Sequence, residues 1–263
     1  MHIHLTDQYL QRDSIAHRLD PRTKILLALG LILAIALVPA GAFVAYGVLY
    51  LFLLLAIFSA RIDLAYVLKR SFIAIPFALA AITLPFTVPG ETLVTLPILG
   101  GVTISAEGTI RFVSILIKSW ISVQAAILLV AITPFPDLLW GLRALHVPAT
   151  LVAIVGFAYR YLFVLSDEAL RLTQARTARS AVIDGQRSGG SLLWRGKVTG
   201  RMVGGLMLRS MERSERIYNA MLARGYQGQM RVLSRPHMGR QDYLILVLSI
   251  VLFVIVVSLS RIL

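Results

Sequence analysis

Few residues in this sequence have the types and spacing that chemistry needs. His2 and His4 lie beside the N-terminal amine and could bind a metal ion, but two imidazoles without further ligands nearby are weak evidence. The stretch SLLWRGKVT (191–199) resembles a phosphate loop, yet Ser191 replaces its first glycine and Val198 replaces the Mg²⁺-binding Ser or Thr. Neither paired carboxylates within the apolar segments nor a serine–histidine–aspartate arrangement is found. We therefore predict a chain that is not an enzyme and that holds no metal, cofactor or ATP of its own.

Lys118 is a charged residue inside a long apolar segment. A charge at such a position by default suggests a function, here a contact with another membrane protein or with a lipid headgroup. The alternative is that the side chain extends to the membrane interface near Arg111. The sequence alone leaves both interpretations open.

A repeated pattern of alanine, arginine and a small residue occurs as ARS (178–180) and ARG (223–225). Each copy is placed where a long polar helix is expected to end, and a single copy would need only a helix-cap explanation. Two copies in one basic region favour docking, because the guanidinium fork of Arg179 or Arg224 suits a carboxylate-lined groove. The flanking small residues would keep each helix tip thin enough to enter such a groove.

The composition places these candidates in a membrane protein. The chain has 263 residues, 57% of them hydrophobic, and a mean hydropathy of +0.78. It has 26 Lys and Arg against 13 Asp and Glu, and the absence of cysteine excludes disulfides and thiol catalysis. The positive balance fits a membrane protein with a basic cytoplasmic region better than a nucleic-acid binder, because basic patches interleaved with aromatic residues are missing.

Five apolar runs predict five transmembrane helices. They lie at 25–40, 42–59, 71–88, 109–133 and 243–260. Pro76 and Pro85 are expected to kink the third. The loop 88–108 contains no basic residue, and its β-branched residues around Gly100-Gly101 suggest a short hairpin.

Charge decides how a sixth candidate run, 148–165, is interpreted. The N-terminus is basic, and 160–240 holds 15 Lys and Arg against five acids, so both are expected in the cytoplasm. An even number of crossings must separate them, and the first four runs already satisfy this. We therefore assign 148–165 to a helix at the cytoplasmic membrane face and expect the C-terminus outside. The predicted domains are a membrane domain at 1–133, a cytoplasmic module at 134–240 and a final transmembrane helix at 241–263.

Two long helices are expected in the module. The first begins at Ser166 as N-cap and ends near Asp184-Gly185, and the second runs from Leu192 to Ala223 with Gly225 just past its end. Glycines recur every fourth residue along the second helix, at Gly196, Gly200 and Gly204. They would either allow the first helix to cross closely or leave the second helix frayed or kinked. Methionines also follow this helix and predict either a core stripe or an adaptable partner surface: Met202, Met207, Met211 and Met221.

Nearly the whole chain resembles the transmembrane T component of energy-coupling factor (ECF) transporters, most closely the cobalt-type CbiQ branch. The resemblance rests on ARS, ARG, and three further stretches: HRLDPRTK (17–24), TPFPDLLWGLRALHVP (133–148) and YRYLFVLSDEALR (159–171). It implies an all-α integral membrane protein whose cytoplasmic module carries crossing coupling helices. Ser180 stands where many members have glycine, a common variant.

The resemblance also implies partners and roles. The chain would be a non-catalytic coupling subunit in the cell inner membrane, joining two ABC-type ATPase subunits, which bind ATP and Mg²⁺, to a membrane S component that binds the substrate. A metal-binding S component, cobalt uptake and a small auxiliary membrane subunit are expected, and no nucleic acid. The ATPase contacts would be Ala178, Arg179, Ser180, Ala223, Arg224 and Gly225. Lys118, Met202, Met207 and Met211 are candidates for contact with the S component. A nickel or vitamin transporter, a membrane-embedded enzyme and a self-sufficient permease are the alternatives.

Overall fold

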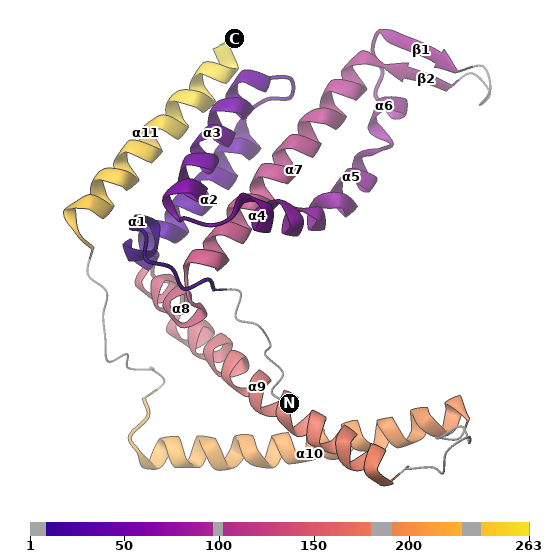
Figure 1. Cartoon of the computed structure of the whole chain (residues 1–263), viewed down its shortest axis with the longest axis vertical. Coiled ribbons are helices and arrows are strands. Elements are labelled where there is room, and N and C mark those ends of the chain that lie inside the picture. The colour runs from indigo at the N-terminus through magenta and orange to yellow at the C-terminus, as the bar shows by residue number, and fades with distance from the viewer. Residues whose placement is uncertain (1–8, 97–101, 180–190, 228–237, 263) are drawn as a thin grey trace. The chain divides into compact units, whose positions relative to one another are not determined.

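The computed structural model describes residues 9–96, 102–179, 191–227 and 238–262 (Figure 1). The chain divides into two compact units. The bundle unit comprises Gln8–Leu145 and Ser234–Leu263, and the α9–α10 unit contains His146–Leu233. The division differs from the predicted domain boundary at 134, because helix α8 (Phe135–Ala144) packs on α2 within the bundle unit.

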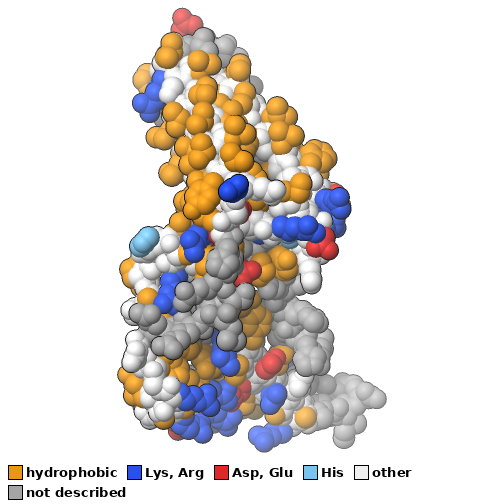
Figure 2. Space-filling model, turned by 90° about the vertical axis from the view of Figure 1, so that its left-hand side faces the viewer, with side chains coloured by type: hydrophobic (Ala, Val, Ile, Leu, Met, Phe, Trp, Pro, Cys, Tyr) orange, Lys and Arg blue, Asp and Glu red, His pale blue; other side chains and the backbone are white. Residues whose placement is uncertain are grey.

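Among the residues that the structure describes, the bundle unit is helical apart from one hairpin. Its further helices are α1 (Ile15–Arg18), α2 (Pro21–Leu37), α3 (Phe43–Ser59), α4 (Leu64–Ser71), a 3-10 turn (Phe72–Ala74), α5 (Ile75–Ala81), α6 (Leu84–Thr87), α7 (Ala106–Ile132) and α11 (Arg240–Ile262). Helix α2 lies against α11, α7 and α3, and the side chains between them form an apolar core that includes Ile35, Leu49, Leu53 and Ile121. The outward faces carry large exposed apolar side chains, which suits a surface in contact with lipid (Figure 2).

The predicted third span is broken at its prolines. Pro76 and Pro85 begin the short helices α5 and α6, where a missing backbone N–H costs no hydrogen bond. The helical path from Leu64–Ala74 to Leu79–Thr87 bends by 44°. The expected kink at Pro76 is therefore confirmed, and the one at Pro85 stays a prediction.

The structure gives a different number of candidate membrane spans from the five that the sequence predicts. By length and composition, three described helices could cross a bilayer (α7, α9 and α11), or four if the bent pair forms one span. Helices α2 and α3 each have 17 residues, somewhat fewer than the ~20 that a typical bilayer requires. The helical membrane-protein class is confirmed, and the count of five crossings remains a prediction.

The loop before α7 forms the expected hairpin. Strands β1 (Thr92–Leu96) and β2 (Val102–Ser105) pair antiparallel. Ser105 then caps α7, because its side-chain oxygen accepts a hydrogen bond from the N–H of Gly108 at 2.9 Å. A Cβ added to Gly108 would lie 2.5 Å from the carbonyl oxygen of Leu84, so glycine lets α6 approach α7 closely.

The α9–α10 unit consists of two long helices, α9 (Ala149–Arg179) and α10 (Leu192–Ala223). The predicted bounds of α10 are confirmed, and Ser191 caps it through the N–H of Trp194. The predicted break before α9's second half is wrong: Ser166 lies mid-helix and donates its hydroxyl hydrogen to the carbonyl of Leu162 at 2.7 Å. The run 148–165 and the following polar helix are therefore one continuous element.

Candidate functional site

The ARG motif forms the end of α10. Arg224 is the C-cap residue and Gly225 follows with φ +77°, a left-handed conformation that glycine adopts without a Cβ clash. The N–H of Gly225 donates to Leu222 O at 2.9 Å and the N–H of Tyr226 to Met221 O at 3.0 Å. This pair of bonds defines a Schellman turn, which satisfies the last carbonyls of the helix. The predicted role of Gly225 at the position after the cap is confirmed.

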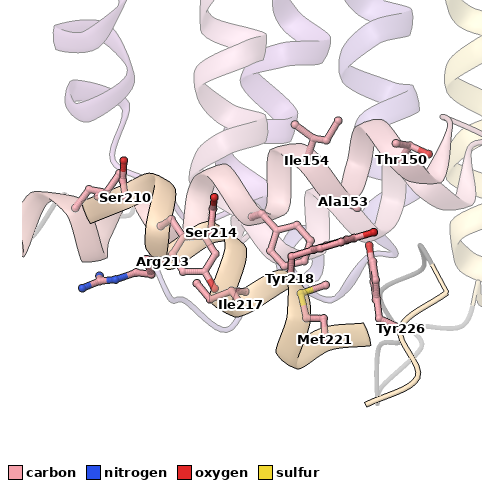
Figure 3. A pocket seen from close by; sticks show the side chains of 13 residues that line it. Thr150, Ala153, Ile154, Ser210, Arg213, Ser214, Ile217, Tyr218, Met221 and Tyr226 are labelled. Carbon is pink, nitrogen blue, oxygen red and sulfur yellow. The ribbon is translucent and has the colours of Figure 1, made fainter. Parts of the chain in front are cut away.

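Tyr226 turns back from this cap onto α9. Its ring meets Phe157 edge to face, with centroids 6.5 Å apart. Figure 3 shows α9 and α10 on opposite sides of a largely apolar cavity of about 510 Å³, with Tyr218 and Met221 beside Tyr226. Sequence reasoning missed Tyr226, although an apolar residue after the glycine is a usual partner in a Schellman turn. The contact fixes where the α10 tip lies relative to α9.

Ion pairs also join α9 to α10, away from the contact of Tyr226 with Phe157. Glu168 of α9 accepts from Arg213 at 3.1 Å and from Arg209 at 3.4 Å, and its side chain is largely covered. Arg176 donates to the hydroxyl of Thr199 at 3.0 Å. A carboxylate shared by two guanidinium groups is a stronger tie than an isolated surface pair. The sequence did not single out Glu168.

The two motif arginines differ from these paired ones. Arg179 and Arg224 are exposed, as are Ala178 and Ala223. Within the described parts of the chain, neither guanidinium has a hydrogen-bond or salt-bridge partner. Ser180 lies outside the described residues. The structure thus leaves two guanidinium groups free for an external acceptor, one at the described end of α9 and one at the end of α10 (Figure 1).

The glycine ladder does not form the expected close crossing within the described chain. A Cβ added at Gly196, Gly200 or Gly204 would meet no atom within 4 Å. The half-buried stripe of α10 consists instead of Val198, Met202, Leu206, Ser210, Arg213, Ile217 and Met221. The glycines lie on a different side of α10 from this stripe, and their predicted helix-crossing role stays a prediction.

The methionines divide between two faces of α10. Met202 and Met221 belong to the half-buried stripe, and Met221 lines the cavity of Figure 3. Met207 and Met211 are 60% and 55% exposed. Met207 and Met211 share helical spacing with Val203 and Leu222, which are also exposed. Helix α10 therefore carries a second apolar stripe whose side chains remain in solvent.

Lys118 serves the end of α2. Its Nζ donates to Val38 O and also approaches Ala36 O at 3.4 Å, so the ammonium group stabilises carbonyls that the helix leaves unpaired. One turn earlier, Ser114 accepts from the N–H of Gly41 at 3.0 Å. Lys118 thus points toward α2 within the bundle unit, and a role in holding the α2–α3 turn is visible directly.

The described residues give no support to a metal site at the N-terminal histidines. His2 and His4 lie outside the described residues, and the described ranges hold no cluster of three or more His, Asp or Glu suited to a metal ion. His17 contacts neighbouring groups of the chain: its ring nitrogens lie 2.7 Å from Ser14 Oγ and 2.9 Å from Leu10 O. Burial lowers the pKa of His17 and favours the neutral ring.

Comparison with known proteins gives a consistent result. The sequence profile of the family described as cobalt transport protein (CbiQ) matches residues 12–235. The chain is 31% identical over 263 positions to the energy-coupling factor transporter transmembrane protein EcfT of Heliobacterium modesticaldum, covering 95% of this chain and 94% of that one. It is 30% identical over 207 positions to the cobalt transport protein CbiQ of Rhodobacter capsulatus, covering 64% and 82%. The nickel permease LarQ of Lactiplantibacillus plantarum is 30% identical over 123 positions, covering 47% and 42%.

Proposed function

Because the chain belongs to the CbiQ family of cobalt transport proteins and resembles EcfT over nearly its full length, we propose that it is the coupling subunit of an ECF-type importer. In this role it passes movements of ATPase subunits to a separate membrane protein that binds the substrate. ATP and Mg²⁺ would be bound by the ATPases, and this chain would not catalyse a reaction. The profile and the relative named CbiQ favour cobalt as the substrate.

The free guanidinium groups of Arg179 and Arg224 carry this proposal. Each occupies an exposed position in a repeated motif, while Arg209 and Arg213 are engaged with Glu168. A guanidinium group presents a rigid fork of donors that binds carboxylates with two parallel hydrogen bonds. Two such tips on one rigid pair of helices suit two copies of an ATPase subunit, each offering an acidic groove. Ala178, Ser180, Ala223 and Gly225 would shape the tips.

The exposed stripe of α10 supports a second contact. Met207 and Met211 are flexible, polarisable side chains, which suit an interface that forms and dissociates. We propose these two as S-component contacts in preference to Lys118, which bonds the end of α2, and Met202, which is half-buried. The basic N-terminus and the basic α9–α10 unit would face the cytoplasm, the C-terminus would face outside, and a small auxiliary membrane subunit would complete the complex.

The test replaces each motif arginine and a matched control. Arg179→Glu and Arg224→Glu reverse the charge at the tips, and Arg201→Glu does so at another exposed α10 position with no partner among the described residues. We expect each motif variant to weaken capture of the ATPase about tenfold or more, because loss of a charge-assisted contact costs a few kcal/mol. The double motif variant should abolish ⁵⁷Co²⁺ uptake, and Arg201→Glu should leave capture and uptake unchanged.

Normal assembly and uptake by the double motif variant would overturn the coupling assignment. Uptake by proteoliposomes that contain this chain alone would identify a self-sufficient permease instead. Substrate turnover by the purified chain alone would identify a membrane enzyme.

Nickel is the second candidate substrate, because one relative is named a nickel permease. Cells that express the complete transporter can be compared for ⁶³Ni²⁺ and ⁵⁷Co²⁺ uptake, with each unlabelled ion as competitor. Preferential nickel uptake would replace cobalt in the proposal, and uptake of neither metal would favour a vitamin. In each of these cases the coupling role of this chain remains the same.

A further inference from the structure

The first turn of α2 contacts every element through which the chain leaves and re-enters the bundle unit. The chain passes to the α9–α10 unit after α8 and returns before α11. The turn consists of Asp20, Pro21, Arg22, Thr23 and Lys24, and Thr23 and Lys24 are almost completely buried. The elements attached to it are α11, α8, the end of α7 and α1.

Asp242 attaches α11. Its Oδ1 accepts from the N–H of Asp20 at 3.0 Å, and its Oδ2 accepts from the N–H of Gly239 at 2.8 Å. Asp242 is 7% exposed, so these two bonds replace the water that a carboxylate otherwise binds. The same carboxylate therefore caps the start of α11 and ties it to a residue 222 positions earlier. Hydrogen bonds to an ionised group at a buried position are among the stronger ones in proteins.

Helix α8 packs on the same turn, at Pro21 and Arg22. The Arg22 guanidinium carbon lies 4.5 Å from the centroid of the Trp140 ring, a cation–π contact. A Cβ built on Gly141 would lie 3.3 Å from the Cβ of Pro21 and 2.8 Å from the end of the Ile25 side chain. Glycine at this position thus lets the α8 backbone approach α2 closely, which leaves α8 little freedom to move.

Lys24 attaches the end of α7, from which α8 follows. Its Nζ donates to Ile132 O at 3.2 Å and to His17 O at 2.8 Å. The residue is 5% exposed, and its two carbonyl acceptors lie on α7 and on the α1 helix. Contacts from this one helical turn thus reach α11, α8, α7 and α1.

We propose that the first turn of α2 is the fixed anchor through which movement of the α9–α10 unit reaches the bundle, with Asp242 as its principal positioning residue. This inference rests on the proposed coupling function. Force that enters the bundle through α8 or α11 arrives at this turn, because both helices are bound to it. If the turn is intact, displacement of α8 or α11 is passed to the other bundle helices; if one attachment is lost, that helix is displaced without them.

The first test removes the α11 attachment in the complete transporter. Asp242→Ala deletes both acceptors, and Asp242→Asn keeps one of them. We expect the ⁵⁷Co²⁺ transported per ATP hydrolysed to fall about tenfold in Asp242→Ala and less in Asp242→Asn, since coupling between sites is typically worth roughly 5- to 150-fold. ATPase capture should stay normal, because Arg179 and Arg224 are unchanged.

Asp63→Ala is the matched control. Asp63 is also a carboxylate that caps a helix, accepting from the N–H of Ala65 at 3.1 Å, but it is exposed and binds only within its own turn. Its loss should leave the ratio of transport to hydrolysis unchanged. A defect that is only structural would lower transport and hydrolysis together in Asp242→Ala and leave their ratio intact, which would overturn the inference.

A second test does not depend on weakening the fold. The chain has no cysteine, so Pro21→Cys with Gly141→Cys introduces a single pair. The Cβ separation of 3.3 Å is close to the ~3.5–4.5 Å of disulfides. A fixed anchor predicts that the oxidised, cross-linked transporter retains at least about half of the uptake of its reduced form. Loss of uptake on oxidation, restored by a reductant, would show that α8 moves on α2 and would overturn the inference.

The outcomes separate this inference from the proposed function. If Arg179→Glu and Arg224→Glu abolish assembly while the Asp242 variants transport normally per ATP, only the anchor is wrong. If the arginine variants assemble and transport normally, the coupling role itself fails.

Discussion

Replacing Gly225 tests whether the turn at the end of α10 positions Arg224. An L-residue at φ +77° costs about 1–2 kcal/mol relative to glycine, and alanine recovers about 0.4–1 kcal/mol by restricting the unfolded chain. A Cβ at this position meets no atom within 4 Å, so no steric term is added. The net penalty for Gly225→Ala is therefore about 1 kcal/mol, or about fivefold in an equilibrium constant.

Binding to the purified ATPase measures this penalty directly, with the chain in nanodiscs and titration calorimetry as the readout. If the Schellman turn must form before Arg224 docks, Gly225→Ala should weaken binding about fivefold. Gly225→Asn should weaken it less, because asparagine tolerates the left-handed region better than alanine. Hydrogen exchange at the N–H groups of Gly225 and Tyr226, or of the residue substituted there, should accelerate in the same order.

Gly200→Ala is the opposing control. Gly200 lies within α10, and a Cβ added there also meets nothing within 4 Å, so alanine should stabilise the helix by about 0.5–1 kcal/mol. Its affinity for the ATPase should be unchanged. Wild-type affinity for both Gly225 variants would refute the reasoning, because Arg224 would then dock without the left-handed turn.

Three further outcomes follow from the bundle unit. Gly108→Ala places a Cβ 2.5 Å from Leu84 O and 2.9 Å from Pro85 Cα, so it should lower the free energy of unfolding by about 1–3 kcal/mol in thermal melts. A Cβ added at Gly47 meets open space, so Gly47→Ala should not lower it. Gln124 is fully buried and neither amide atom has a hydrogen-bond partner among the described residues, so Gln124→Leu should raise the melting temperature; a lower value would contradict this view of the site. Burial holds the pKa of His17 below its ordinary 6.5, so the unfolded chain binds the proton first and stability declines as pH falls through about 6.5. Melts between about pH 8 and about pH 5 should show this decline in the wild type and less of it in His17→Gln, and equal slopes would exclude His17 as its source.

Local signals predicted local structure well. Gly225 marked the end of α10, because the cap chemistry there depends on residues only a few positions apart. The prolines marked the broken third span for the same reason. Ser166 misled the prediction, since a serine can bond either the next turn as a cap or the carbonyl four residues back, and only the surrounding chain decides.

Long-range contacts were not predictable from the sequence alone. Helix α10 carries two apolar stripes, and its periodicity could not show that Met202 is half-buried while the glycine side stays open. The bond between Asp20 and Asp242 spans 222 positions, so no spacing rule points to it. The exposed motif arginines were identified from their repetition, and their docking role remains a proposal.

The shortness of α2 and α3 has a consequence for the lipid around them. Seventeen helical residues extend about 26 Å, whereas the hydrocarbon core of a typical bilayer is about 30 Å thick. The neighbouring α7, with 27 residues, extends about 40 Å. If α2, α3 and α7 all cross the membrane, as predicted, the bundle presents helices of unequal length to it, and the bilayer would thin beside α2 and α3. Hydrophobic mismatch of this kind makes acyl-chain length a variable that tunes the protein's conformational energy, independently of any partner subunit.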